Sequence, residues 1–305
     1  MSITHKALLA ALTDISGIGD ARAYELYTHF SDPLELFDAP DSLLQDFHYI
    51  DSDTLAALQS LDEAVETYGQ RFETYESDGI TVIGVTDEQY PDSVRANPAP
   101  VLLYAKGNID LLSKPAVGVS GSRETNATGQ QWIQSLAAEI SQEGYVVVSG
   151  GARGADTAAH RGAIETPNST IVVLGTGVNV AYPPENQSLF DEVLQAGGLL
   201  LSMRPPDAEP TSHAFIERNE LIAALSDGLI FVATDGSGGT MAQYEMARDR
   251  GRPTFVPPAT LEIEPQDGIS TLRTADDTTT IRTATDIKQA LSVAGSQQLN
   301  LDEWT

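Results

Sequence analysis

The chain has 305 residues, of which 41% are hydrophobic, and it carries 44 acidic against 17 basic residues, for a formal net charge of −27. A chain of this length and composition can bury a sizeable core and suits one large α/β domain with a smaller module. The lack of cysteine excludes disulfides and thiolate chemistry, and the five scattered histidines offer no metal-ligand spacing. We therefore expect no metal and no cofactor.

The charge is spread along the whole chain, and only four of the 17 basic residues are lysines. An excess of carboxylates with few lysines is typical of a cytoplasm at molar salt, where the Debye length is only ~3 Å and like-charge repulsion is screened. No stretch approaches the ~18 apolar residues that span a bilayer, and no signal-like segment begins the chain. We therefore expect a halophilic, cytoplasmic protein without a membrane segment.

The first 75 residues predict a helical module. Its most informative stretch is Ile15–Asp20, which reads ISGIGD. The glycine spacing before a helix resembles a helix-hairpin-helix, in which backbone N–H groups approach a DNA phosphate. Acidic residues flank this turn, and Arg22 is the only basic residue nearby. A purely structural helical hairpin is therefore an equal alternative.

The segment 115–160 organises the rest of the chain. An apolar run at Ala116–Val119 leads into a glycine turn and a helix with apolar residues on one face. A second predicted strand, Tyr145–Val148, runs into the turn Ser149–Gly154 and a helix that begins near Ala158. Two such units in succession imply a parallel sheet, and ligands of open α/β sheets bind at the carboxyl ends of the strands.

The same alternation continues towards the C-terminus. Further strands are predicted at Thr170–Leu174, Gly198–Ser202, Gly228–Ala233 and Thr254–Val256, with helices between them. We therefore predict an α/β fold in which residues 76–292 form one domain around a parallel sheet. A polar tail, residues 293–305, follows this domain and contains Trp304.

Four of the predicted strands end in glycine-rich turns. Glycine lets backbone N–H groups face an anion closely, and each following helix N-terminus adds about half a positive charge. Together the turns indicate a phosphate-binding edge of the sheet. Its candidate residues are Gly121 and Ser122, then Ser149, Gly150 and Gly154, then Gly175, Thr176 and Gly177, and finally Gly238, Gly239 and Thr240.

Arginines accompany these turns. Between residues 115 and 258 there are eight arginines and no lysine. Arg123 and Arg153 lie within two of the turns, and Arg218 lies at a predicted helix start beside Asn219. A planar guanidinium in such a place can hold a phosphate through two hydrogen bonds. We predict that these four residues bind phosphate.

Asp156 and His160 lie four residues apart on one predicted helical face. We interpret Asp156 as a helix cap and His160 as a partner in a structural hydrogen bond, in preference to acid–base chemistry. The sequence lacks the GxxxxGK[ST] loop for nucleoside triphosphates, the GxGxxG fingerprint with its ribose-binding acid, and the GxSxG nucleophile elbow. No catalytic residue is predicted.

The glycine turns also carry a resemblance to a known family. The segments GSR at Gly121–Arg123, SGGARGAD at Ser149–Asp156, GTG at Gly175–Gly177 with Tyr182 and Pro183, Phe215 with Arg218 and Asn219, and GRP at Gly251–Pro253 resemble the DprA/Smf family of DNA-processing proteins. The resemblance covers nearly the whole chain and includes the glycine hairpin near Ile15.

This resemblance implies that residues 76–292 form an extended Rossmann-like domain that binds single-stranded DNA. It further implies a protein that protects incoming strands during transformation and loads a RecA-type recombinase onto them for DNA recombination. Because family members commonly dimerise, a homodimer is expected.

One turn departs from the family pattern and leaves a second function open. The turn 238–240 is more similar to the GGxGT of LOG-type phosphoribohydrolases, which release a base from a nucleoside monophosphate. Those enzymes carry a glutamate three residues after the threonine, where this chain has Gln243, and an amide cannot supply the carboxylate. A non-enzymatic protein is therefore our first interpretation, and a hydrolase or nucleotide-sensing protein is the alternative.

The composition predicts that the fold needs high salt. A surface with a net charge of −27 repels itself strongly once the Debye length grows to ~10 Å at ~0.1 M salt. We expect the melting temperature, followed by circular dichroism, to rise between low and molar potassium chloride. A melting temperature that stays constant over this range contradicts the prediction.

Overall fold

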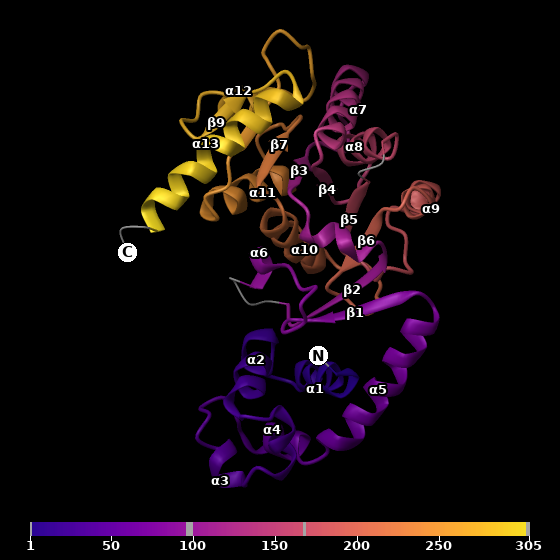
Figure 1. Cartoon of the computed structure of the whole chain (residues 1–305), viewed down its shortest axis with the longest axis vertical. Helices are drawn as coiled ribbons and strands as arrows, with labels where there is room; N and C mark the ends of the chain where they lie inside the picture. The colour runs from indigo at the N-terminus through magenta and orange to yellow at the C-terminus, as the bar shows by residue number, and fades with distance from the viewer. Residues whose placement is uncertain (1, 96–99, 167–168, 303–305) are drawn as a thin grey trace. The chain divides into compact units, whose positions relative to one another are not determined.

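The computed structural model describes residues 2–95, 100–166 and 169–302. The chain divides into two compact units, Met1–Ala105 and Lys106–Thr305 (Figure 1). The first unit is longer than the helical module of residues 1–75, because it also contains β1 (Ile80–Gly84) and most of β2 (Leu102–Gly107). Within the described ranges, no helix combines the length and hydropathy of a membrane span.

The first unit is mainly helical. Its helices are α1 (Ile3–Asp14), α2 (Asp20–His29), α3 (Asp41–Leu44), α4 (Ser52–Leu58), α5 (Leu61–Ser77) and α6 (Asp92–Arg95), with a 3-10 helix, η1, at Pro33–Asp38. The long helix α5 packs along α1. The amino group of Lys6 in α1 donates to the carbonyl of Val82 in β1 (2.7 Å) and pairs with the carboxylate of Asp87 (2.9 Å). These contacts join α1 to β1.

The glycine hairpin between α1 and α2 is held by contacts within the first unit. Gly17 has a positive φ of 87°. Arg22 donates to the carbonyl of Gly17 (2.6 Å), and its guanidinium lies over the ring of Tyr49. The carboxylate of Asp20 accepts the N–H of Val101 (2.8 Å). Because the charged side chains beside the turn are engaged within the protein, these contacts favour the structural hairpin over a DNA-binding one.

The strands of the second unit form a parallel sheet in the order β6-β5-β4-β3-β7-β8-β9. They are β3 (Ala116–Ser120), β4 (Val146–Ser149), β5 (Thr170–Leu174), β6 (Leu199–Ser202), β7 (Gly228–Phe231), β8 (Thr254–Val256) and β9 (Thr278–Thr280). The chain leads from β3 outwards to β6 and then returns to β7 on the other side of β3, so the topological switch point lies between β3 and β7. This arrangement confirms the predicted α/β fold with a parallel sheet.

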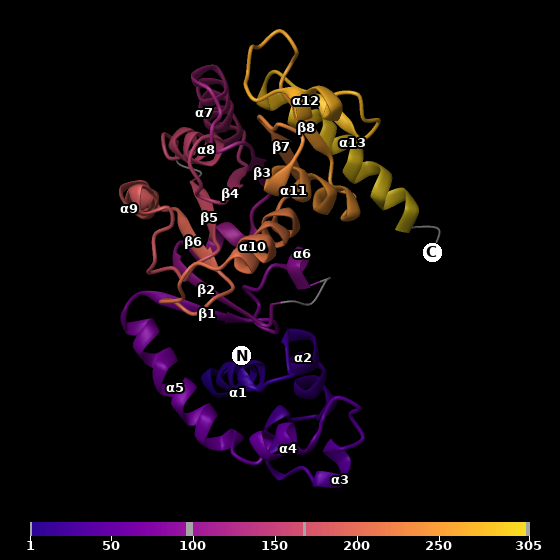
Figure 2. The ribbon, with the colours of Figure 1, turned by 180° about the vertical axis from the view of Figure 1, so that it is seen from behind.

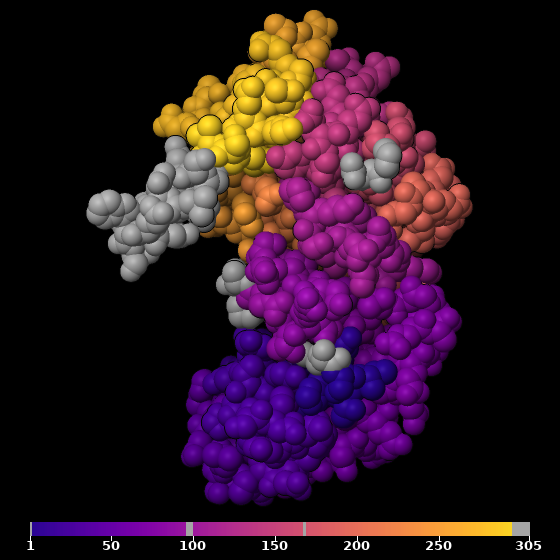
Figure 3. Space-filling model, in the orientation of Figure 1, coloured from indigo at the N-terminus to yellow at the C-terminus, as the bar shows by residue number. Residues whose placement is uncertain are grey.

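Helices cover both faces of this sheet. They are α7 (Ala127–Gln142), α8 (Ala155–Ala163), α9 (Gln187–Gln195), α10 (Ser212–Leu225), α11 (Gly238–Asp249), α12 (Asp267–Leu272) and α13 (Ala284–Asp302). Val117 and Val119 of β3 pack in one core cluster with residues of α7, α8 and α13, and Figure 3 shows α13, in yellow, directly beside α7. Gly118, between the two valines, faces Ser226 at the end of α10. The helices α10 and α11 pack on this opposite face (Figure 2).

The C-terminal part of the second unit differs from the sequence pattern. The strand β9 reads TTT and is largely exposed, so it lacks the apolar alternation from which strands are predicted. It forms because Thr254 to Val256 of β8 offer it a parallel partner. The helix α13 runs through most of the expected polar tail, to Asp302. Trp304 lies outside the described residues.

Two helical glycines offer a matched test of how tightly α7 and α8 pack. A Cβ on Gly162 of α8 would lie 2.0 Å from the carbonyl oxygen of Gln134 in α7, whereas a Cβ on Gly69 of α5 would have no atom within 4 Å. Alanine favours a helix over glycine by ~1 kcal/mol. We expect Gly69→Ala to raise the melting temperature by ~2 °C and Gly162→Ala to lower it, because the clash with backbone outweighs propensity. Equal shifts in thermal melts would contradict close α7–α8 packing.

Candidate functional site

A pocket of about 240 Å³ opens beside the carboxyl ends of β4 and β5 in the second unit. Its walls come from the turns after β3 and β4, from the segment that follows β5, and from α10. The lining residues are Arg123, Gly150, Ala152, Arg153, Tyr182, Pro183, Pro184, Glu185, Phe215 and Arg218. The structure therefore brings together four of the predicted site residues, namely Arg123, Gly150, Arg153 and Arg218.

Arg218 forms the floor of this pocket. It is only 7% exposed, and one terminal nitrogen of its guanidinium donates to the carbonyl of Val173 in β5 (3.1 Å). A Cβ on Gly150 would lie 1.5 Å from the same nitrogen, so only glycine lets the backbone of the turn rest against this group. The prediction that Arg218 lies at a helix start is wrong: α10 begins at Ser212, and Arg218 lies in its second turn.

The guanidinium of Arg218 is attracted by one charged neighbour, Asp156, and repelled by another, Arg123. Burial lowers the pKa of Arg218, the carboxylate of Asp156 opposes this shift, and the nearby charge of Arg123 reinforces it. Burial likewise raises the pKa of the Asp156 carboxyl, against the attraction of Arg218. A guanidinium remains protonated in proteins. The pocket thus holds a buried positive charge that is repelled by a second arginine at its mouth.

Asp156 also binds the turn after β4. Its carboxylate accepts the N–H of Ala152 (3.2 Å), and this bond and one from the N–H of Gly150 partly oppose the rise in its pKa that burial causes. Because Asp156 is the second residue of α8, whose N-cap is Gly154, its interpretation as a helix cap is wrong. The protein's own carboxylate occupies amides of this turn that the sequence suggested for phosphate.

His160 lies four residues after Asp156 in α8 and is fully buried. Its Nδ1 makes a 2.9 Å hydrogen bond with the hydroxyl of Thr170, which itself donates to the carbonyl of Val147 (2.5 Å). Nδ1 therefore carries the proton and donates. Burial, together with the charge of Arg218, lowers the pKa of His160 to about 3. His160 is thus a neutral, structural side chain that does not line the pocket.

The glycines after β5 serve close packing. A Cβ on Gly175 would lie 2.5 Å from the ring of Phe215, and one on Gly177 would lie 2.1 Å from the carbonyl of Pro206. Thr176 between them is 1% exposed, and its hydroxyl donates to the carbonyl of Val180 (2.7 Å). Gly175 leaves space for the ring of Phe215 in the pocket wall, and none of the three residues lines the pocket itself.

Gly121 and Gly154 allow the turns after β3 and β4 to meet. A Cβ on Gly121 would lie 2.6 Å from the Cβ of Ala155, and one on Gly154 would lie 2.5 Å from the carbonyl of Ser122. Ser149 is fully buried, and its hydroxyl donates to a carbonyl of β3 (2.8 Å). This packing fixes Arg123 and Arg153 on neighbouring turns.

The fourth glycine turn, after β7, does not line the pocket. Gly238 and Gly239 are exposed at the start of α11, and nothing lies within 4 Å of a Cβ on Gly238. The nearest atom to a Cβ on Gly239 is the amide nitrogen of Asn219, at 3.8 Å. Asn219 and Thr240 are half-buried. Of the candidate glycine turns, the turn 238–240 is the one whose glycines are exposed to solvent.

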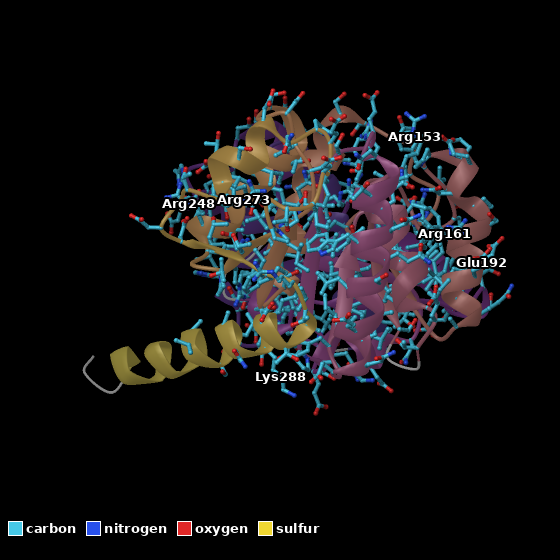
Figure 4. The ribbon with its side chains drawn as sticks, turned by 90° about the horizontal axis from the view of Figure 1, so that it is seen from above. Arg153, Arg161, Glu192, Arg248, Arg273 and Lys288 are labelled. Atoms are coloured by element: carbon cyan, nitrogen blue, oxygen red, sulfur yellow. The ribbon has the colours of Figure 1, made fainter. Side chains whose placement is uncertain are left out.

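The mouth of the pocket carries an ion pair. Arg153 lies 3.7 Å from Glu185, and their side chains are 61% and 54% exposed. Figure 4 places Arg153 and Arg161 towards one side of the second unit and Arg248 and Arg273 towards the other. Glu185 was not among the predicted site residues, and a lone glutamate in an acidic chain gives no signal that could single it out.

Two aromatic rings complete the pocket wall. The rings of Tyr182 and Phe215 lie 5.1 Å apart between centroids, and Tyr182 is 37% exposed. The guanidinium of Arg218 lies 5.9 Å from the centroid of Phe215. Neither ring was a predicted site residue, although an aromatic residue directly before a proline after β5 was a usable signal. Within the described part of the chain, no group of acidic and histidine side chains could hold a metal ion.

Residues 81–292 match the family model described as DNA recombination-mediator protein A. The chain is 35% identical over 189 residues to DNA processing protein DprA of Bacillus subtilis, covering 61% of this chain and 63% of that protein. It is 38% identical over 178 residues to the DprA of Streptococcus pneumoniae, covering 58% and 62%. The chain thus spans less than two thirds of the length of these relatives.

Solved structures agree with these matches. A structure of DNA processing protein A from Helicobacter pylori, reported for its unique single-stranded DNA binding mode, aligns with a TM-score of 0.61 at 30% identity, over 70% of this chain and 95% of that one. The structure of DprA from Streptococcus pneumoniae aligns with a TM-score of 0.64 at 28% identity, over 89% and 98%. Because the family match covers well over half of its length, the chain belongs to the DNA recombination-mediator protein A family, the DprA/Smf family that its glycine turns resemble.

Proposed function

We propose that this protein binds single-stranded DNA in the pocket beside β4 and β5 and acts as a DNA-processing protein in DNA uptake. The observation that carries the proposal is the lining: three arginines and two aromatic rings around about 240 Å³. Phosphate needs cations and bases need flat apolar faces, and single-stranded nucleic acid offers both at once. The solved structure of the Helicobacter pylori relative was reported for its mode of binding single-stranded DNA, the same class of ligand.

The arginines provide the phosphate contacts. Arg123 and Arg153 are exposed at the mouth of the pocket, where their guanidinium groups can turn towards a passing backbone. Arg218 supplies a fixed positive charge below them. Because Arg123 and Arg218 repel each other in the free protein, an anion placed between them relieves this repulsion as well as forming its own contacts.

The aromatic rings provide the base contacts. Tyr182 is the exposed member of the pair, and Phe215 supports it from within the pocket. A base that stacks on an aromatic ring gains ~1–3 kcal/mol whatever its identity. Only an unpaired strand exposes both faces of a base, so this wall favours single strands over duplex. Binding of this kind tolerates all sequences.

The open turn 238–240 is a second phosphate contact in this proposal. Its bare glycine backbone at the start of α11 and the adjacent amide of Asn219 suit a phosphate further along the strand. The other glycines act by allowing the turns to pack. Homodimer formation and the loading of a RecA-type recombinase belong to the same proposal and rest on the family alone.

A nucleotide hydrolase is disfavoured. At the position of the LOG-type glutamate, Gln243 is 4% exposed and cannot act as a base. Asp156 accepts hydrogen bonds from amides of the turn after β4 and lies in the field of Arg218. His160 is neutral and fully buried. We therefore infer that the protein has no nucleotide hydrolase activity.

The arginine assignment predicts the behaviour of two variants. Arg123→Ala and Arg153→Ala should each weaken binding to oligonucleotides of any sequence about equally, and each should lower the slope of log K against log salt by ~0.7, because one phosphate contact is lost. Fluorescence anisotropy across a salt series measures both quantities. Arg161→Ala, which removes an exposed arginine of α8 outside the pocket, is the matched control. Folded Arg123→Ala and Arg153→Ala proteins that bind as tightly as wild type would overturn the assignment.

The ion pair at the mouth predicts a gain of affinity. Glu185→Gln removes the carboxylate that competes with phosphate for Arg153. Exposed ion pairs contribute up to ~1 kcal/mol, so single-stranded DNA should bind up to ~5-fold more tightly. Glu192→Gln removes an exposed charge of α9 outside the pocket (Figure 4) and controls for net charge. Equal gains from both changes would show that only the overall charge matters.

A further inference from the structure

A buried amide lies behind the wall of the pocket. Asn186 is 8% exposed and follows directly on the lining segment 182–185. Its amide nitrogen donates to the carbonyl of Gly151 (2.8 Å) and to the hydroxyl of Thr157 (2.9 Å). Both protons of the amide are therefore used inside the protein.

The hydroxyl of Thr157 extends this chain of hydrogen bonds. It accepts from Asn186 and donates to the carbonyl of Ala152 (2.7 Å), which also accepts the backbone N–H of Thr157 (3.1 Å). Two successive carbonyls, those of Gly151 and Ala152, are thus held by Asn186 and Thr157. Neither of these side chains lines the pocket.

The backbone of the turn 150–153 is also constrained by its own conformation and packing. Gly151 has a positive φ of 71°, and a Cβ there would lie 2.8 Å from Val172 and 2.9 Å from the ring of Phe190. The N–H of Ala152 is held by Asp156. The backbone N–H and the backbone carbonyl of Ala152 are therefore both fixed by hydrogen bonds. They immediately precede Arg153, whose side chain reaches the mouth of the pocket.

Asn186 thereby joins two segments that do different work in the proposed function. One segment, 150–153, carries Arg153 for phosphate, and the other, 182–185, carries Tyr182 for a base. A strand can engage both only if their separation is fixed before it binds, because ordering a loose turn on binding reduces affinity.

We propose that Asn186 and Thr157 are positioning residues, which hold the phosphate segment 150–153 at a fixed place relative to the base segment 182–185. This inference rests on the proposed binding of single-stranded DNA. They contact no DNA themselves, so their loss weakens binding without removing a phosphate contact. That combination separates them from the arginines, whose loss lowers the salt slope.

The test compares Thr157→Val, which removes the hydroxyl, with Thr157→Ser, which keeps it. Thr157→Val should bind a single-stranded oligonucleotide ~10-fold more weakly than wild type with an unchanged salt slope, and Thr157→Ser should stay within ~2-fold. Thr166→Val is the matched control, because the hydroxyl of Thr166 also donates to a backbone carbonyl, that of Ala163 (3.0 Å), beyond the far end of the same helix. Hydrogen exchange of amides 151–153 in the free protein should accelerate only in Thr157→Val.

If Thr157→Val does not fold, Asn186→Ala provides the same comparison and should show the same weakening at an unchanged slope. Equal affinities of Thr157→Val and Thr157→Ser, with wild type binding normally, would overturn the positioning role alone. A fall in the salt slope in Thr157→Val would also overturn it, because it would indicate a lost phosphate contact. Wild-type protein that binds no single-stranded DNA would overturn the proposed function and this inference together.

Discussion

The site depends on one buried cation. Transferring a charge from water into the protein is strongly unfavourable unless partners replace the lost hydration. Arg218 receives a carbonyl from β5, the field of Asp156, and the bare backbone of Gly150 against its guanidinium. Each of these partners constrains an element: β5, the first turn of α8, and the turn after β4. The geometry of the pocket floor follows from keeping this charge inside.

The same constraint changes how an anion can be bound here. In many α/β sheets the amides of a glycine turn are free for phosphate, but Asp156 has taken the amide of Ala152. In the proposed function, recognition of phosphate is therefore assigned to side chains at the mouth, Arg123 and Arg153. In a protein with a net charge of −27, Arg218, which lies beneath them, adds its own positive charge to that of these two arginines.

The sequence predicts the sheet well because its strands are apolar runs bounded by glycine, as at Thr170–Leu174, which the structure reproduces without a shift. It does not predict β9. The three threonines of this strand show no apolar periodicity, and the strand forms by pairing with β8. At the site, glycine and arginine were visible as residue types, yet their roles depend on tertiary contacts. The residues that flank Gly175 and Arg218 in the sequence do not indicate that Gly175 leaves space for the ring of Phe215 or that the side chain of Arg218 is buried.

The ion pair between Arg153 and Glu185 affects how anion binding in the pocket responds to salt concentration. Ions that screen the attraction between Arg153 and a DNA phosphate also screen its attraction to Glu185. Salt therefore weakens both the free and the bound state of this arginine, but only the bound state also releases counterions that were condensed on the DNA. The contact therefore still weakens as salt rises. Because it exchanges one carboxylate for one phosphate, it adds less affinity at any ionic strength than a contact from an unpaired arginine.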